Sequence, residues 1–173
     1  KKGVLVAENG HFLGKSPARI SLPRSTMNLR YAPNDFVVKP SGTKKIRVIE
    51  IIPDQIVTKE LIATPKIENG EIVADTARDI LKLVVVERHR ATGNVGVGFV
   101  RGFKLKRGAI GSSVAHDAHN VVVTGTNDAD ILRVIQQLEQ LQGGQVAVVD
   151  GKVKAELPLP IAGLVTDQPL TKA

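Results

Sequence analysis

Residues 121–144 read VVVTGTNDADILRVIQQLEQLQGG and combine two different periodicities. The valines at residues 121–123 form a short, wholly apolar run, which is typical of a central strand in a sheet. Apolar side chains then recur at spacings of three and four between residues 131 and 141. This pattern predicts an amphipathic helix over residues 128–142, directly after a buried strand.

Both ends of the predicted helix carry termination signals. Asn127 or Thr126 can accept hydrogen bonds from the first backbone N–H groups of the helix. Gly143 and Gly144 follow its last turn, where a left-handed conformation commonly ends a helix. The stretch therefore specifies one helix with defined ends.

The remainder of the chain reads as strands joined by tight turns. Asn-Gly or Asp-Gly pairs at residues 9–10, 69–70 and 150–151 favour the positive φ angles of type I′ hairpins. Runs rich in β-branched residues predict strands at residues 46–52, 80–86, 95–100, 109–114, 121–123, 146–149 and 153–157, and on both sides of the second turn within residues 67–74. We therefore expect an α+β fold, a mostly antiparallel or mixed sheet with several hairpins and one long amphipathic helix.

Proline content divides the chain into three parts. Residues 1–14 hold the first predicted hairpin. Residues 15–44 contain four prolines and little periodicity, so we interpret them as a linker or as a strap over another surface. Residues 45–173 then form the α+β domain.

Composition excludes several classes of protein. Hydrophobic residues make up 42% of the chain and charged residues 24%, which is ordinary for a globular protein. No apolar stretch approaches the roughly 20 residues of a membrane-spanning helix, and the apolar run near Lys1 is too short for a signal peptide. We expect a cytoplasmic protein without a membrane partner. The absence of cysteine excludes disulfides, thiolate nucleophiles and cysteine-ligated zinc.

The formal net charge of +7 raises the possibility of nucleic-acid binding. Aromatic residues, which would stack on bases, are only 3% of the chain. The basic residues are also scattered, with one group at residues 44–47 and another at residues 101–107. We therefore favour a solvated basic surface and expect no nucleic-acid partner.

One polar cluster lies between apolar runs. It consists of Ser112, Ser113, His116, Asp117, His119 and Asn120. Unpaired polar groups cost about 1–3 kcal/mol each when buried, so the cluster either pairs internally or faces a pocket. These six residues are our candidates for a substrate site or a lid over one. Glu87, Arg88 and His89 directly follow an apolar strand and are secondary candidates at a pocket rim, the alternative being a solvated strand end.

Self-contained catalytic sites are disfavoured. His116 and His119 would share a face only in a helix, and the other histidines are distant in sequence, so we expect no metal bound by this chain. A catalytic serine triad is disfavoured because the sequence lacks the Gly-x-Ser-x-Gly motif that positions such a serine. Residues 92–98 match a phosphate-binding glycine loop only loosely. The remaining structural alternative is a hydrogen-bonded corner at residues 116–119 that ends a strand.

Several motifs together resemble the C-terminal domain of bacterial adenine deaminase over residues 45–167. They are Glu87-Arg88-His89, GFVRGF at 98–103, LKRGAI at 105–110, SSVAHD at 112–117, His119-Asn120 and LPLPIAGL at 157–164. Residues 1–14 are also similar to the last strands of the β-sandwich that flanks the catalytic barrel in the amidohydrolase superfamily. The chain departs from the family pattern at Lys104, Gly111 and Ala118, where glycine, alanine and serine are usual.

The resemblance implies an enzyme of purine salvage that hydrolyses adenine to hypoxanthine and ammonia. Its divalent metal, manganese, iron or zinc, would lie in a (β/α)8 barrel, which takes about 250 residues. This chain has 173 residues, so the barrel, its metal ligands and its catalytic residues would lie outside it. We expect the isolated chain to bind no cofactor and not to deaminate adenine.

In the intact enzyme the resemblance implies three partners: the catalytic barrel, adenine and further copies in a homo-oligomer. The segment from Ser112 to Asn120 would then line or cover the mouth of the active site. The alternative is a non-catalytic interaction or oligomerisation module in which the same segment only braces the sheet.

Overall fold

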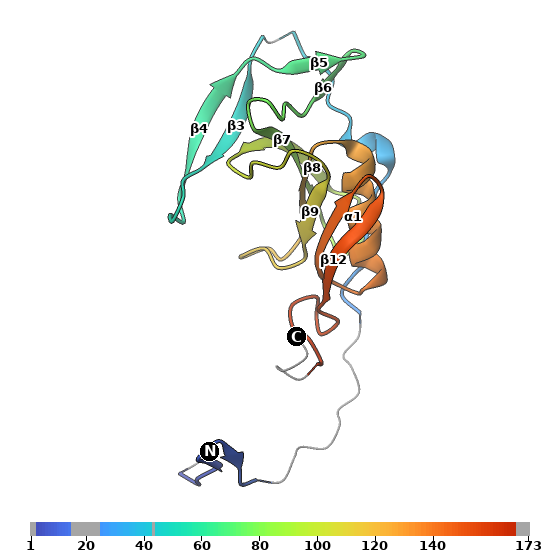
Figure 1. Ribbon diagram of the computed structural model, residues 1–173. Helices are drawn as coiled ribbons and strands as arrows, with labels where there is room; N and C mark the ends of the chain where they lie inside the picture. Colours follow the sequence, from blue (N-terminus) through green and yellow to red (C-terminus); the bar gives the residue numbers. More distant parts are fainter. Residues whose placement is uncertain (1–2, 15–24, 43, 169–173) are drawn as a thin grey trace.

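The computed structural model describes residues 3–14, 25–42 and 44–168, and it is built around one large sheet (Figure 1). The strands of this sheet are β3 (Ile46–Ile51), β4 (Thr58–Ala63), β7 (Ile80–Val86), β8 (Val95–Arg101), β9 (Ala109–Ser112), β10 (Val121–Gly125), β11 (Gly144–Val149) and β12 (Lys152–Pro158). They lie in the order β12-β11-β9-β10-β7-β8-β3-β4. All neighbours are antiparallel except β3 and β8, so the predicted mixed α+β fold is confirmed.

The three predicted tight turns are present. They join β1 (Ala7–Glu8) to β2 (His11–Phe12), β5 (Lys66–Glu68) to β6 (Glu71–Val73), and β11 to β12. Both central residues of each turn have φ angles between 48° and 78°, as type I′ geometry requires. The predicted strand at residues 109–114 ends earlier, at Ser112. Strand β4 was not predicted, because TKELIA offers no β-branched run.

Helix α1 (Asp128–Gln140) begins as predicted, since the Asn127 side chain accepts a hydrogen bond of 2.8 Å from the Asp130 N–H. Its end contains one left-handed residue more than the prediction. Gln142 has a φ of 60°, and Gly143 and Gly144 follow with φ angles of 108° and 149°. The Gly143 N–H donates to the Leu138 carbonyl at 2.9 Å. The adjacent glycine instead permits close packing, because a Cβ on Gly144 would lie 2.2 Å from a backbone oxygen of β12.

The main core lies between α1 and one face of the sheet. Buried side chains of α1 meet buried side chains of β9, β10 and β11. They include Ile131, Val134, Ile135 and Leu138 on the helix, and Val121, Val123, Val146 and Val148 on the strands. Glycines let the helix come close, since a Cβ on Gly111 would lie 2.6 Å from Val134, and one on Gly125 would lie 2.6 Å from Ile131.

Two of the three departures from the family pattern have a structural context. Lys104 has a φ of 58°, a conformation that favours glycine. Gly111 lies under α1, where an alanine would force Val134 and Val123 apart. Ala118 is exposed in a turn.

Part of the predicted strap belongs to this core. Met27 and Phe36, the latter at the end of the short 3-10 helix η1 (Pro33–Phe36), are buried in the same cluster as α1. Residues 15–24 of the predicted strap lie outside the described residues. The division into three parts stays a prediction.

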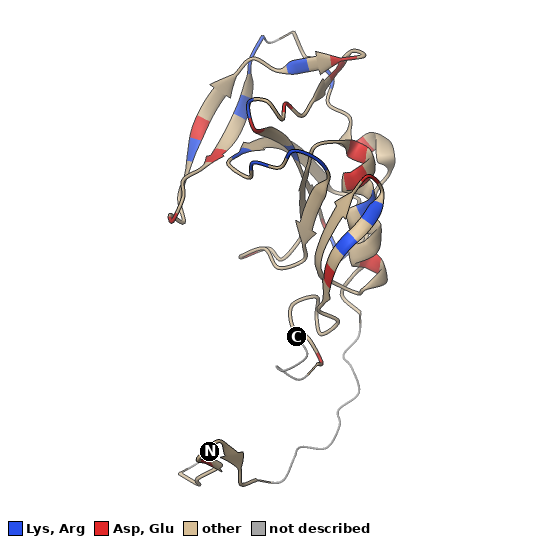
Figure 2. Ribbon diagram, in the orientation of Figure 1, with Lys and Arg blue, Asp and Glu red and all other residues tan. Residues whose placement is uncertain are grey.

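Charged side chains are distributed over many elements. In Figure 2, Lys and Arg are spread over β3, β4, β12 and the connection between β8 and β9. Several pair with carboxylates, as Arg47 does with Glu60 at 2.6 Å and Arg101 with Glu50 at 3.5 Å. Within the described ranges, no helix has the length and apolar character needed to cross a membrane.

Two buried charges tie α1 to its surroundings. The Lys82 ammonium on β7 contacts the Asp128 carboxylate at 2.7 Å and donates to the Phe36 carbonyl at 2.9 Å. Asp130 is only 2% exposed, and its carboxylate accepts hydrogen bonds from Asn127 and from the N–H of Gly151, the latter at 2.7 Å. The first turn of α1 thus holds the β11–β12 turn in place.

Replacing Asp130 with alanine tests this link. The substitution removes a buried carboxylate and leaves the Gly151 N–H and the Asn127 amide without their acceptor, so we expect it to lower the free energy of unfolding by about 2–3 kcal/mol. Gln140→Ala, on an exposed position of α1, is the control and should change it by less than about 0.5 kcal/mol. Urea denaturation measures both, and equal small effects would contradict the link.

Candidate functional site

The polar segment forms the connection between β9 and β10. Ser112, its first residue, lies opposite Val122 in the ladder between these strands, so both ends of the connection are fixed by the sheet. Residues 116–118 form a turn, and the His119 N–H closes it on the Ala115 carbonyl at 2.6 Å. The six candidate residues therefore lie together, with Ser112 at the end of β9 and the other five in the loop that follows it.

Ser113 holds the base of the loop. Its side chain is fully buried, and its Oγ accepts a hydrogen bond from the Gly144 N–H at 2.8 Å while donating to the Gly163 carbonyl at 2.6 Å. Its own N–H donates to the Gly144 carbonyl at 3.0 Å. The hydroxyl is thus fully used in joining the loop to β11 and to the segment after β12.

Arg88 holds the other end of the loop. Its guanidinium is buried, with 1% of the residue exposed, and donates to the carbonyl of His119, to the carbonyl of Ala162 at 3.0 Å and to Thr26 Oγ1 at 2.6 Å. Burial lowers the pKa of Arg88. Because its contacts are neutral oxygens from three distant segments, Arg88 connects the loop to the chain before β3 and to the chain after β12.

Its two neighbours in sequence also hold loops. The Glu87 carboxylate accepts hydrogen bonds from the N–H groups of Thr92, Arg90 and His89 and from the Thr92 hydroxyl. These bonds, that from the Thr92 N–H first, lower the pKa of Glu87 to about 2. His89 Nε2 lies 2.9 Å from the Ala118 carbonyl of the polar segment. The structure thus brings both groups of candidate residues together.

The tip of the loop projects its side chains into solvent. The side chains of His116 and Asp117 are 84% and 105% exposed, and His116 Nδ1 lies 3.6 Å from Asp117 Oδ1. The imidazole rings of His116 and His119 have centroids 5.2 Å apart. An imidazole can donate and accept hydrogen bonds, and a carboxylate accepts them, so this tip can bind a polar ligand.

His119 and Asn120 are half-buried and carry unused hydrogen-bonding capacity. His119 Nδ1 and Asn120 Oδ1 are buried and have no partner among the described residues. Unpaired polar atoms are uncommon in folded proteins, and each calls for an explanation. A ligand or another polypeptide at this loop would supply the missing partners.

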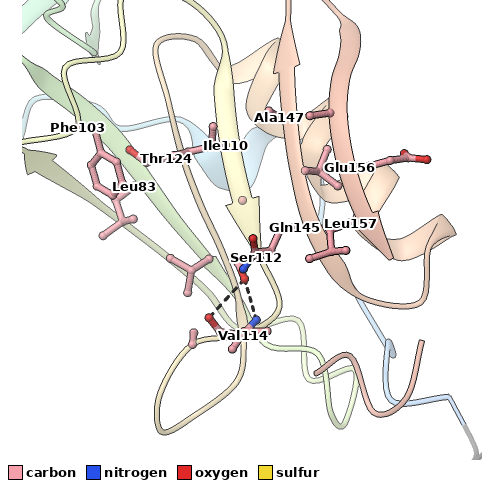
Figure 3. Close-up of a pocket in the computed structure, with 15 residues that line it drawn as sticks. Leu83, Phe103, Ile110, Ser112, Val114, Thr124, Gln145, Ala147, Glu156 and Leu157 are labelled. Carbon is pink, nitrogen blue, oxygen red and sulfur yellow. Dashed lines mark hydrogen bonds between the residues drawn. The ribbon is translucent and has the colours of Figure 1, made fainter. Parts of the chain in front are cut away.

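A hollow opens beside the base of the loop. It encloses about 570 Å³ and lies on the face of the sheet opposite α1. Figure 3 shows Phe103 and Leu83 on one side of it, Ala147 and Leu157 on the other, and Ser112 at the end where the loop begins. Ser112 Oγ accepts a hydrogen bond from the Val114 N–H at 3.0 Å. Sequence reasoning did not identify this hollow, although alternation along each strand carries a signal for it.

The site lacks the elements of independent catalysis. Within residues 3–14, 25–42 and 44–168, no group of three or more His, Cys, Asp or Glu side chains could hold a metal ion. Ser113, the buried serine, contacts backbone groups of Gly144 and Gly163. The arrangement can bind a polar ligand at its tip and hold that tip rigidly.

Comparison with known proteins identifies the family. A model of the adenine deaminase C-terminal domain matches residues 55–173. The chain belongs to this family. It is 48% identical to an adenine deaminase of Dehalococcoides mccartyi over 99% of its own length and 30% of that protein. It is 45% identical to an adenine deaminase of Desulfatibacillum aliphaticivorans over 97% of its length, and 43% identical to one of Bacillus pumilus over 96%, each time covering 30% of the relative.

The chain therefore spans about 30% of the length of the relatives it matches. All three relatives are named adenine deaminase, and the match lies in the domain that ends the family's proteins. For this adenine deaminase C-terminal domain, the loop anchored by Arg88 and Ser113 is a conspicuous polar feature of the described structure. The roles of the nine candidate residues remain predictions.

Arg88→Lys tests the anchoring of the loop. Lysine cannot reproduce the forked contacts to three segments, and hydrogen bonds from charged groups are worth about 1.5–3 kcal/mol each. We expect the free energy of unfolding to fall by at least about 2 kcal/mol. Arg90→Lys, at an exposed position two residues further on, is the matched control. Chemical denaturation measures both, and equal stabilities would contradict the anchoring role.

The lowered pKa of Glu87 predicts that the stability of the fold depends on pH. Its pKa of about 2 in the folded chain lies below the usual value of about 4.3 for an unfolded glutamate. The stabilisation is therefore fully present above that usual value and is lost as the pH falls towards 2. We expect the native chain to lose more stability than Glu87→Gln over this acidic range. Parallel stability curves in denaturation experiments would refute this expectation.

Proposed function

We propose that this domain covers the active site of an adenine deaminase, an enzyme that hydrolyses adenine to hypoxanthine and ammonia in purine salvage. Membership of the C-terminal domain family and the names of the relatives support this proposal. Since the chain spans about 30% of those relatives, the catalytic part corresponds to the remaining length. Its location in the cytoplasm belongs to the same proposal.

The observation that carries the proposal is an exposed polar tip on a rigid base. His116 and Asp117 point into solvent, while Arg88 and Ser113 fix the loop beneath them. A loop held in this way loses little further conformational entropy when it contacts a ligand. The purine ring presents nitrogen acceptors and an exocyclic amine, which an imidazole and a carboxylate can pair with.

The chain contributes positioning and exclusion of water. A divalent manganese, iron or zinc ion bound in the (β/α)8 barrel would activate the attacking water. The described residues of this chain contain no ligand set for such an ion, so its ligands belong to the remainder of the enzyme. The loop would close over adenine, orient its polar edge through His116 and limit the entry of bulk water.

The catalytic barrel, adenine and further copies of the enzyme are the partners in this proposal. The isolated chain would be inactive because it has no metal site among its described residues. A second candidate function is an interaction or oligomerisation module. The bare apolar hollow on the sheet supports that candidate, because such surfaces commonly contact other polypeptides.

The test replaces His116 with alanine in a full-length adenine deaminase that carries this chain. A suitable vehicle is the D. mccartyi enzyme with its matching C-terminal region exchanged for these residues. Losing one hydrogen bond to substrate costs about 0.5–1.5 kcal/mol, so we expect kcat/KM to fall roughly twofold to tenfold. Steady-state kinetics of ammonia release measures the change, and His119→Ala should lower it as well.

His11→Ala is the matched control, since this histidine is exposed on β2. It should leave both kcat and KM unchanged. If His116→Ala and His119→Ala behave like the control, the proposed role of the loop is wrong. A loss of thermal stability without a kinetic effect would instead support the structural corner.

A further inference from the structure

The main sheet has one covered face and one bare face. Helix α1 covers the first, while the second carries the hollow lined by β7, β9, β10, β11 and β12. Side chains alternate between the two faces, so Val123 meets the helix and its neighbour Val122 lines the hollow. A sheet that is apolar on both faces requires a layer on each of them, and the described part of this chain supplies only one.

Beyond the hollow, the same face of the sheet continues over β8, β3 and β4. Ile49 on β3 lies opposite Val100, and Val100 lies opposite Leu81, which precedes the hollow residue Leu83 by two positions on β7. Strand partners share a face of the sheet, so Ile49 belongs to the same surface. It is 44% exposed, and Ile62 on the neighbouring strand β4 is 48% exposed. Leu81 and Val100 are only 0% and 3% exposed, so this face is covered between the hollow and β3, and the bare apolar surface is the hollow itself.

Little charge interrupts the hollow. Of the fifteen residues that line the hollow, Glu156 alone is charged, and its carboxylate accepts a hydrogen bond from Gln137 of α1 at 2.8 Å. Polar side chains there are limited to Ser112, Thr124 and Gln145 beside that glutamate. A partner that fills the hollow must therefore be apolar at its centre, with a few hydrogen-bonding groups around it.

The hollow and the polar segment form one continuous surface. Val114 and Ala115 line the hollow and are followed directly by the exposed His116. Figure 3 shows Val114 at the lower end of the hollow, where the loop turns away from the sheet. Any body that covers the hollow must contact this loop.

We propose that the bare face is the docking surface for the catalytic part of the same polypeptide, an inference that rests on the proposed function. The relatives contain more than twice this chain's length in addition to the matched region, and the matched domain ends the family's proteins. A covalently attached partner has an effective concentration of about millimolar, which favours it over separate chains. Docking here places the catalytic part against the loop that would cover its active site.

The shape of the surface disfavours a second copy as the occupant. A twofold interface brings the same patch of both chains together, so two hollows of about 570 Å³ would face each other. Such a contact leaves a void, whereas folded proteins pack to high density. A convex apolar surface, such as the outer helices of a barrel, fills the hollow and completes a second helical layer on the sheet.

Cysteine labelling tests this proposal, because the chain contains no cysteine of its own. Ala155 is exposed on β12 and lines the hollow, while Gln136 is exposed on α1 and provides the matched control. Ala155→Cys and Gln136→Cys are each made in the isolated chain and in the full-length enzyme described above. Maleimide labelling of the peptide that contains each position is followed by mass spectrometry.

Both cysteines should react rapidly in the isolated chain. In the full-length enzyme, we expect Ala155→Cys to react at least about tenfold more slowly, because thiol reactivity depends on exposure, while Gln136→Cys is unchanged. Equal rates at residue 155 in the two proteins would overturn the proposal. Residue 155 could also label slowly in the isolated chain, with light scattering showing that this chain is a dimer. That result would overturn the proposal in favour of a second copy as the occupant.

A second pair of variants tests the same surface without a cysteine or a label, which could themselves disturb the local structure. Ala155→Glu should lower the thermal stability of the full-length enzyme but not that of the isolated chain, while Gln136→Glu, with the same charge change, should affect neither. Equal effects of Ala155→Glu on both proteins would contradict docking. Labelling does not depend on turnover, so it tests docking separately from the proposed function. Unprotected labelling at residue 155 would contradict docking even if His116→Ala lowers kcat/KM. An unchanged kcat/KM in His116→Ala would contradict the proposed function even if residue 155 is protected.

Discussion

The buried guanidinium of Arg88 is the interaction on which the arrangement of the site depends. It extends from the end of β7 and donates to oxygens of Thr26, His119 and Ala162, which lie far apart in sequence. A buried charge is costly unless its donors are satisfied, so these segments must be present together for the guanidinium to be stable. A Cβ on Gly163 would lie 2.9 Å from this group, which shows how closely the chain closes around it.

The loop between β9 and β10 is therefore rigid at its base and open at its tip. Ser113 and Arg88 engage backbone groups, whereas His116 and Asp117 make little contact with the rest of the domain. The residues that look most reactive in the sequence thus divide into a framework and a contact surface. In the proposed enzyme, the framework would set the position of the contact surface over adenine.

The sheet has a similar division between its two faces. Val121 and Val123 pack against α1 across glycines that bring the helix close, which completes the core on that side. Leu83 and Ile110 instead line an open hollow on the other side. The proposed catalytic part would complete the second layer. Its docking would bury the apolar hollow and would also bring the polar loop against the active site.

The sequence by itself determined the features that depend on neighbouring residues. Asn127 caps α1, and the Asp150-Gly151 turn has positive φ angles, because each feature satisfies backbone requirements within a few residues. The helix end was less predictable, since the positive φ angles begin at Gln142, one residue before the two glycines. The ordered motifs also identified the adenine deaminase C-terminal domain, because they extend over most of the chain.

Only the tertiary structure decided which groups the polar residues contact. In the sequence Arg88 follows a strand and could lie at a pocket rim, yet its partners are 31 to 74 residues away and bury it. The Ser113 hydroxyl likewise bonds to Gly144 and Gly163, and no local sequence pattern connects these glycines to it. The bare face exists because eight strands align their alternating side chains, and strand order is set by long-range packing rather than by any single segment.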